Sequence, residues 1–109
     1  MTDSGEILVF VTTGSEPEAH KIAELLLSRR KAACVNIIPR VDSSFWWQGE
    51  LDSARESLLI IKTKASLLSK IVDLVKAAHS YEVPEIIALS VIGGNEDYLK
   101  WIDDEIRDD

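Results

Sequence analysis

Cysteine is the scarcest reactive residue in this sequence. Cys34 is the only one, so no disulfide can form within the chain. A single thiol is more typical of a reducing compartment than of a secreted, disulfide-stabilised domain. Long apolar runs are also missing: residues 7–11 follow an acidic N-terminal stretch and are too few for a signal peptide or a membrane span. We therefore expect a cytoplasmic protein with no membrane partner.

Positive charge is in the minority. The chain has 19 acidic residues against 12 lysines and arginines, and its net charge is −7. The only run of three basic residues, at 29–31, is expected at the end of a helix, where cations complement the helix dipole. Nucleic-acid binding relies on clustered lysine and arginine, so no nucleic-acid partner is expected. An acidic surface fits solubility, attraction of cations, or both.

Length and composition predict one domain over residues 1–109. Hydrophobic residues make up 46% and charged residues 28%, which is an ordinary globular composition. A domain of this size buries only about 60–70% of the surface that its unfolded chain exposes. Association between copies of the chain is therefore an expected source of stability.

Apolar runs and turn signals predict the element order β-α-β-β-α-β-α. Strands are expected at residues 7–11, 33–41, 57–63 and 86–92, and helices at about 15–30, at 66–79 and after residue 95. This split βαβ order predicts a mixed α/β (α+β) chain with the ferredoxin-like β-α-β-β-α-β arrangement and a C-terminal helix. The sheet should be antiparallel, with two helices on one of its faces.

Short polar signals mark the ends of these elements. Ser15 and Glu18 form a capping box, and Ser66 and Asn95 are expected to cap the second and third helices. Pro39, near the end of the second strand, indicates an edge position or a bulge. Residues 43–48 are expected to continue that strand as an extended arm.

Aromatic residues are few, at 6%, yet three of them are adjacent: Phe45, Trp46 and Trp47. In an extended segment neighbouring side chains point to opposite faces, so the two tryptophans cannot be buried by the same surface. One interpretation is an arm that folds back over its own core. The preferred interpretation is an arm that packs on its own subunit with one face and on a neighbour with the other, because tryptophan is favoured at interfaces.

Cys34 and His79 are the main candidates for metal ligands, because a cysteine–histidine pair suits copper or zinc. No CxxC, HxH or HExxH spacing accompanies them. Each residue also has a structural interpretation: Cys34 as a small buried core residue, and His79 as a polar residue at the end of a helix. Both interpretations are open on the residues alone.

The stretch 79–85 is the densest in polar chemistry. It places an imidazole, a phenol and two carboxylates, from His79, Tyr81, Glu82 and Glu85, in a turn that leads into a strand. Loops on a rigid scaffold are where ligand-binding groups usually lie. Lys62, in the third strand, could supply a partner charge if strand alternation directs it to the same side. The alternative is a hydrated turn in which Pro84 sets the entry to the strand.

Five segments carry a resemblance to a known family. Residues 32–39, 46–51, 59–63, 79–86 and 95–101 resemble, in order, characteristic segments of the CutA divalent-cation tolerance family. Two departures occur: Ala78 stands where some members have a second histidine, and Ser80 replaces the usual proline.

The resemblance implies a tight homotrimer in which strands of neighbouring chains extend one another's sheets. It also implies a link to tolerance of copper and other divalent metals, and a trimer shape like that of PII signalling proteins, with clefts between subunits. By matching position, the implied metal contacts are Cys34 and His79, the implied cleft residues are Lys62, Tyr81, Glu82 and Glu85, and the implied trimer contacts are Phe45, Trp46 and Trp47.

Three functions compete at this point. The first is a non-enzymatic trimer that binds copper or another divalent metal, and the second is a PII-like trimer that binds a small ligand or a protein. An enzyme ranks third, because the sequence has no nucleophile–base signature and no glycine-rich phosphate loop. We expect no catalytic residues and no required cofactor.

Overall fold

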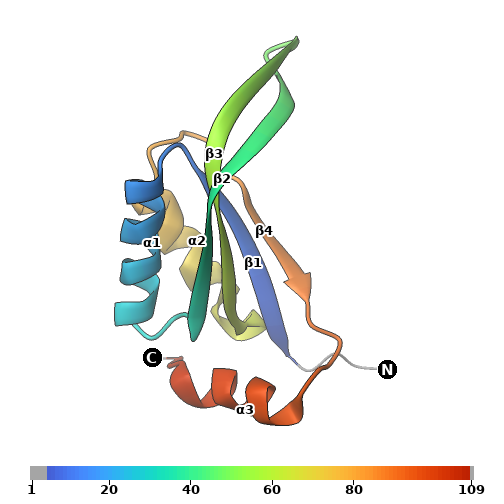
Figure 1. Ribbon diagram of the computed structural model, residues 1–109. Helices are drawn as coiled ribbons and strands as arrows, with labels where there is room; N and C mark the ends of the chain where they lie inside the picture. Colours follow the sequence, from blue (N-terminus) through green and yellow to red (C-terminus); the bar gives the residue numbers. More distant parts are fainter. Residues whose placement is uncertain (1–4, 109) are drawn as a thin grey trace.

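A four-stranded antiparallel sheet organises the chain. The computed structural model describes residues 5–108. The strands lie in the order β2-β3-β1-β4. Figure 1 shows α1 and α2 together on one face of the sheet and α3 across one end. The predicted element order and ferredoxin-like arrangement are confirmed. The elements are β1 (Glu6–Thr13), α1 (Glu16–Ser28), β2 (Cys34–Trp47), β3 (Glu50–Lys64), the short 3-10 helix η1 (Ala65–Leu67), α2 (Leu68–Ala78), β4 (Ile86–Ser90) and α3 (Glu96–Glu105).

The core lies between the sheet and the two helices. Alternate residues of a strand point to opposite faces, and in β1 the buried set is Ile7, Val9 and Val11. Their partners in β3 lie on the same face, because directly paired residues of antiparallel strands share a face. The helices complete this core with an apolar stripe each, formed by Ala19, Ile22, Ala23 and Leu26 of α1 and by Ile71 and Val75 of α2.

Two of the three predicted helix caps are confirmed. The Ser15 side chain accepts a hydrogen bond of 3.3 Å from the Glu18 backbone N–H, and Asn95 accepts one of 3.0 Å from the Asp97 N–H. The prediction that Ser66 caps the second helix was wrong. The chain enters α2 through η1, and the Ser66 hydroxyl instead donates to Asp108 at 3.1 Å.

The central hairpin is longer than predicted. β3 begins at Glu50 rather than at residue 57, and β2 continues to Trp47, so residues 41–56 form a two-stranded arm that projects beyond the sheet (Figure 1). Its turn is Gln48-Gly49, with positive φ at both residues (51° and 83°), as a two-residue hairpin turn requires. β2 is an edge strand with a register shift around Pro39, which confirms that prediction.

The opposite face of the sheet is largely uncovered. Strand register places Leu8 and Phe10 of β1 beside Ile87 and Leu89 of β4 on this face, and Ile87 and Leu89 are 53% and 45% exposed. We call this surface the open face; its members are Leu8, Phe10, Cys34, Asn36, Ile38, Leu58, Ile60, Lys62, Ile87 and Leu89. β4 ends at Ser90, two residues earlier than predicted. Among the described residues, no helix has the length and apolar character to cross a bilayer.

Candidate functional site

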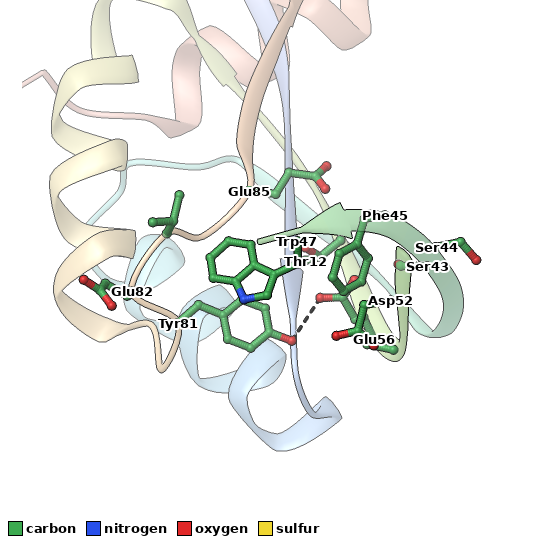
Figure 2. Close-up of a pocket in the computed structure, with 12 residues that line it drawn as sticks. Thr12, Ser43, Ser44, Phe45, Trp47, Asp52, Glu56, Tyr81, Glu82 and Glu85 are labelled. Carbon is green, nitrogen blue, oxygen red and sulfur yellow. Dashed lines mark hydrogen bonds between the residues drawn. The ribbon is translucent and has the colours of Figure 1, made fainter. Parts of the chain in front are cut away.

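A cavity of about 730 Å³ lies between the arm and the turn of residues 79–85. Figure 2 shows its lining side chains, which come from the arm on one side and from the turn on the other. Its volume is that of a typical small-molecule site, about 300–1,000 Å³. The lining residues are Thr12, Ser43, Ser44, Phe45, Trp47, Asp52, Ala54, Glu56, Tyr81, Glu82, Val83 and Glu85.

A hydrogen bond joins the two sides of this cavity. The Tyr81 hydroxyl donates to Glu56 Oε2 at 3.0 Å, as the dashed line in Figure 2 marks. Burial, together with this bond and the negative charge of Glu56, raises the pKa of Tyr81 to about 12. Burial, and secondarily the charge of Glu56, also raises the pKa of Glu85. The electrostatic environment of the cavity is therefore negative.

His79 connects the turn of residues 79–85 to strand β1. Its side chain is fully buried, and Nε2 lies 2.7 Å from the Thr12 carbonyl oxygen. Nδ1 accepts the Tyr81 backbone N–H at 3.0 Å, so the ring donates through Nε2–H to Thr12. Glu18 adds a hydrogen bond from the Ser80 N–H at 2.6 Å. Both ring nitrogens of His79 are thus engaged, and a metal ion would have to displace one of these partners.

Cys34 lies far from His79. It is the first residue of β2, on the open face, and pairs with Lys62, which in turn pairs with Leu8. His79 is bound to Thr12, four residues further along β1, which corresponds to about 13 Å of strand. The structure does not bring the two predicted metal contacts together in one chain, and no three potential ligands converge among the described residues. Metal binding by either residue stays a prediction.

The predicted cleft residues divide between two places. Tyr81, Glu82 and Glu85 line the cavity within this chain, and their place at a cleft between subunits stays a prediction. Lys62 instead lines a smaller cavity under α3, where its ammonium lies 5.7 Å from the centre of the Tyr98 ring. Asp52 and Glu56 line the main cavity and were missed. They are four residues apart, an even spacing that places both on one face of a strand. This signal was hidden because residues 50–56 were not predicted to be a strand.

The aromatic arm residues follow the predicted alternation. Phe45 and Trp47 line the cavity, whereas Trp46 does not and is 71% exposed. The arm does not fold back over its own core, because it extends beyond the sheet (Figure 1). That these residues contact a neighbouring subunit stays a prediction.

Comparison with known proteins gives a consistent family. The sequence model for the family described as CutA1 divalent ion tolerance protein matches residues 7–105. The chain is 44% identical over 102 residues to the chloroplastic protein CutA 1 of Oryza sativa, a match that covers 94% of this chain but 58% of the rice protein. It is 45% identical over 97 residues to the divalent-cation tolerance protein CutA of Thermus thermophilus, of which it covers 94%.

Solved structures agree with the sequence matches. The Thermus thermophilus divalent cation tolerance protein superposes with a TM-score of 0.92 at 43% identity, over 94% of this chain and 99% of that one. A relative from Archaeoglobus fulgidus, described as periplasmic, has a TM-score of 0.91 at 38% identity, over 94% of this chain and 99% of that one. Since relatives are described as chloroplastic or periplasmic, the cytoplasmic location stays a prediction. On these matches, the chain belongs to the CutA1 divalent ion tolerance protein family.

Proposed function

We propose that the chain works as a non-enzymatic homotrimer that takes part in divalent-cation tolerance and binds copper or another divalent metal at the contacts between its subunits. Family membership supports the tolerance role, because the matching family and its Thermus relative carry that description. The assembly and the metal site are argued below from the open face and from the positions of the candidate ligands.

The open face is the observation that carries the assembly. It is mostly apolar, with Asn36 and Lys62 as its polar members, and Ile38, Ile87 and Leu89 are each at least 40% exposed. Contiguous apolar surfaces of this kind mark protein–protein contacts. Trp46 and its strand partner Leu51 add exposed apolar area on the arm. In addition, β2 and β4 are edge strands, whose free backbone groups can pair with strands of another copy.

The proposed metal site takes ligands from more than one subunit. Cys34, the one thiol, lies on the open face and would enter the subunit contact, where a second copy can add ligands. Thiolate is a ligand suited to Cu(I). His79 is the other candidate. Because both nitrogens of His79 are hydrogen-bonded, we rank Cys34 first.

Native mass spectrometry tests both parts of this proposal. The protein is measured without metal and with one equivalent of Cu(I) or Cu(II) per chain, beside Cys34→Ser and Cys34→Ala. A trimer that takes up copper and loses it in both variants supports the site. A trimer that stays copper-free in every form rules out the metal site and keeps the assembly, and a monomer overturns the assembly.

The cavity supports a second candidate function, a PII-like trimer that binds a small ligand. Its volume of about 730 Å³ and its mixture of aromatic and polar groups are those of a small-molecule site. A ligand that binds there should raise the melting temperature, because binding to the folded state stabilises it by mass action. Screening by thermal shift tests this function, and the absence of any responding compound would count against it.

A further inference from the structure

The cavity beside Tyr81 combines aromatic walls with uncompensated negative charge. The aromatic rings belong to Phe45, Trp47 and Tyr81, and Figure 2 shows them around the same space as the carboxylates of Asp52 and Glu56. Glu82 and Glu85 bring the lining carboxylates to four. The described residues that line the cavity include no lysine, arginine or histidine. The site therefore has several negative groups and no positive group of its own.

No ion pair elsewhere in the described chain relieves these charges. The ion pairs of the arm are those of Asp42 with Arg40 and Arg55, and they do not involve a cavity carboxylate. Glu56 is only 9% exposed, and its one hydrogen-bond donor here is the neutral Tyr81 hydroxyl. Burial and, secondarily, the charge of Glu56 raise the pKa of Glu85, and a cation in the cavity would offset the second of these causes.

The aromatic walls specify which kind of cation fits. A bare divalent ion needs several converging oxygen, nitrogen or sulfur ligands, and no such group of three exists among residues 5–108. An alkylammonium ion differs, because its charge is attracted by the faces of tryptophan and tyrosine while its alkyl groups pack against apolar surface. Trp47, Tyr81, Phe45 and Val83 offer both kinds of surface.

We infer that this cavity binds a small organic ammonium ion, held by Glu56 and Glu85 and enclosed by Trp47 and Tyr81. The inference gives a ligand class to the second candidate function above, on which it rests, and it is independent of the metal site at Cys34. A lysine or arginine side chain of another protein carries the same charge, but the cavity volume of about 730 Å³ is in the range of small-molecule sites.

Calorimetric titration with a matched set of probes tests the inference. The probes are butylammonium and butyltrimethylammonium as primary and quaternary cations, butanol as the neutral analogue, and Mg²⁺ as a bare charge, all at constant ionic strength. We expect saturable binding of at least one ammonium probe and none of butanol or Mg²⁺. Equal binding of butanol would show an apolar pocket only, equal binding of Mg²⁺ would show unspecific electrostatics, and both overturn the inference. Failure of every probe also overturns it.

Two variants locate the site, and a third serves as their control. Trp47→Leu and Glu56→Gln should each weaken ammonium binding about five- to thirtyfold. Trp101→Leu changes a tryptophan of α3 that is 41% exposed and does not line the cavity, and it should leave the affinity unchanged. Circular dichroism checks that each variant folds, and Glu85→Gln replaces Glu56→Gln if that variant does not. An equal loss in Trp101→Leu would overturn the assignment.

The metal proposal and this inference can be tested independently of each other. Cys34→Ala removes the proposed soft ligand and lies outside the cavity, so it should lose copper while keeping ammonium affinity. A protein that binds ammonium but no copper keeps the inference alone. A responding compound of another chemical class in the thermal-shift screen would keep the small-ligand function and overturn the ammonium assignment.

Discussion

The hydroxyl of Tyr81 and the carboxylate of Glu56 lie 3.0 Å apart, and this hydrogen bond ties the turn of residues 79–85 to the base of the arm. Tyr81→Phe removes the bond and leaves a buried carboxylate without its donor. Because hydrogen bonds to charged groups contribute about 1.5–3 kcal/mol, we expect a loss of about 1–2 kcal/mol in the free energy of unfolding. Urea denaturation at a fixed protein concentration measures it.

Tyr98→Phe is the matched control for this change. Tyr98 is 41% exposed and packs its ring against Trp101, so removing its hydroxyl should change stability little. Equal losses of unfolding free energy in the two variants would show that the Tyr81–Glu56 hydrogen bond contributes no more than an exposed hydroxyl does.

The raised pKa of Tyr81 predicts a loss of stability at alkaline pH. Its pKa is raised from 10.0 to about 12, so the folded chain holds the phenolic proton more tightly than the unfolded chain. The stability that this group adds is complete below the ordinary pKa of 10.0 and is lost as the pH rises through about 12. Absorbance titration of tyrosinate should show one late-titrating tyrosine, which disappears in Tyr81→Phe. A wild-type titration without a late-titrating tyrosine would contradict the prediction.

The strands of the central sheet could be predicted because each has an apolar run that is visible in the sequence itself. The arm could not be, since residues 50–56 carry no such run and become a strand only by pairing with β2. Glu56 gains its role from that pairing and from Tyr81, which is 25 residues away in the chain. The face on which Lys62 lies could not be predicted, because it is set by the register with Leu8 and Cys34, which the sequence does not show.

His79 predicts a large structural effect that is separate from metal binding. His79→Ala leaves the Thr12 carbonyl and the Tyr81 N–H without their partner in a buried setting. We expect a loss of about 2–4 kcal/mol in unfolding free energy, because each unsatisfied buried group costs about 1–3 kcal/mol. Hydrogen exchange at the Tyr81 amide should also become faster.

His20→Ala is the control for that change. His20 is exposed on α1, and its one ion-pair partner within residues 5–108 is Glu16 at 3.3 Å, so its removal should have a small effect on stability. A His79→Ala protein as stable as the wild type would remove the argument that His79 fixes the turn.

The carboxyl groups of Asp103 in α3 and Glu6 in β1 predict a loss of stability as the pH rises. The hydrogen bond between them, followed by burial and the charges of Glu6 and Asp104, raises the pKa of Asp103, although Lys64 at 3.9 Å opposes the shift. The folded state therefore favours the protonated form. This contribution to stability is complete below the ordinary pKa of 3.8 and is lost as the pH rises through the raised value.

Asp103→Asn should consequently raise the urea midpoint at neutral pH, because the amide offers Glu6 a donor that needs no proton uptake. The gain should vanish below the ordinary pKa of 3.8, where wild-type Asp103 is itself protonated. Asp104→Asn is the control, since Asp104 pairs with exposed Lys100 at 2.7 Å and should show no gain. A lower midpoint for Asp103→Asn at neutral pH would mean that the Lys64 contact outweighs the carboxyl repulsion.

One charge introduced on the open face should prevent assembly without disturbing the fold of the single chain. Leu89 is 45% exposed on this face, so Leu89→Glu should leave the fold of each chain intact. In an assembly that buries the face, the same carboxylate would be desolvated without a partner, at a cost of about 3 kcal/mol or more per subunit. Native mass spectrometry should then show the wild type as a trimer and the variant as a monomer, with unchanged circular dichroism.

Leu27→Glu is the control, because Leu27 is comparably exposed, at 39%, but lies on α1. Dissociation by both variants, or by neither, would mean that copies associate through a surface other than the open face.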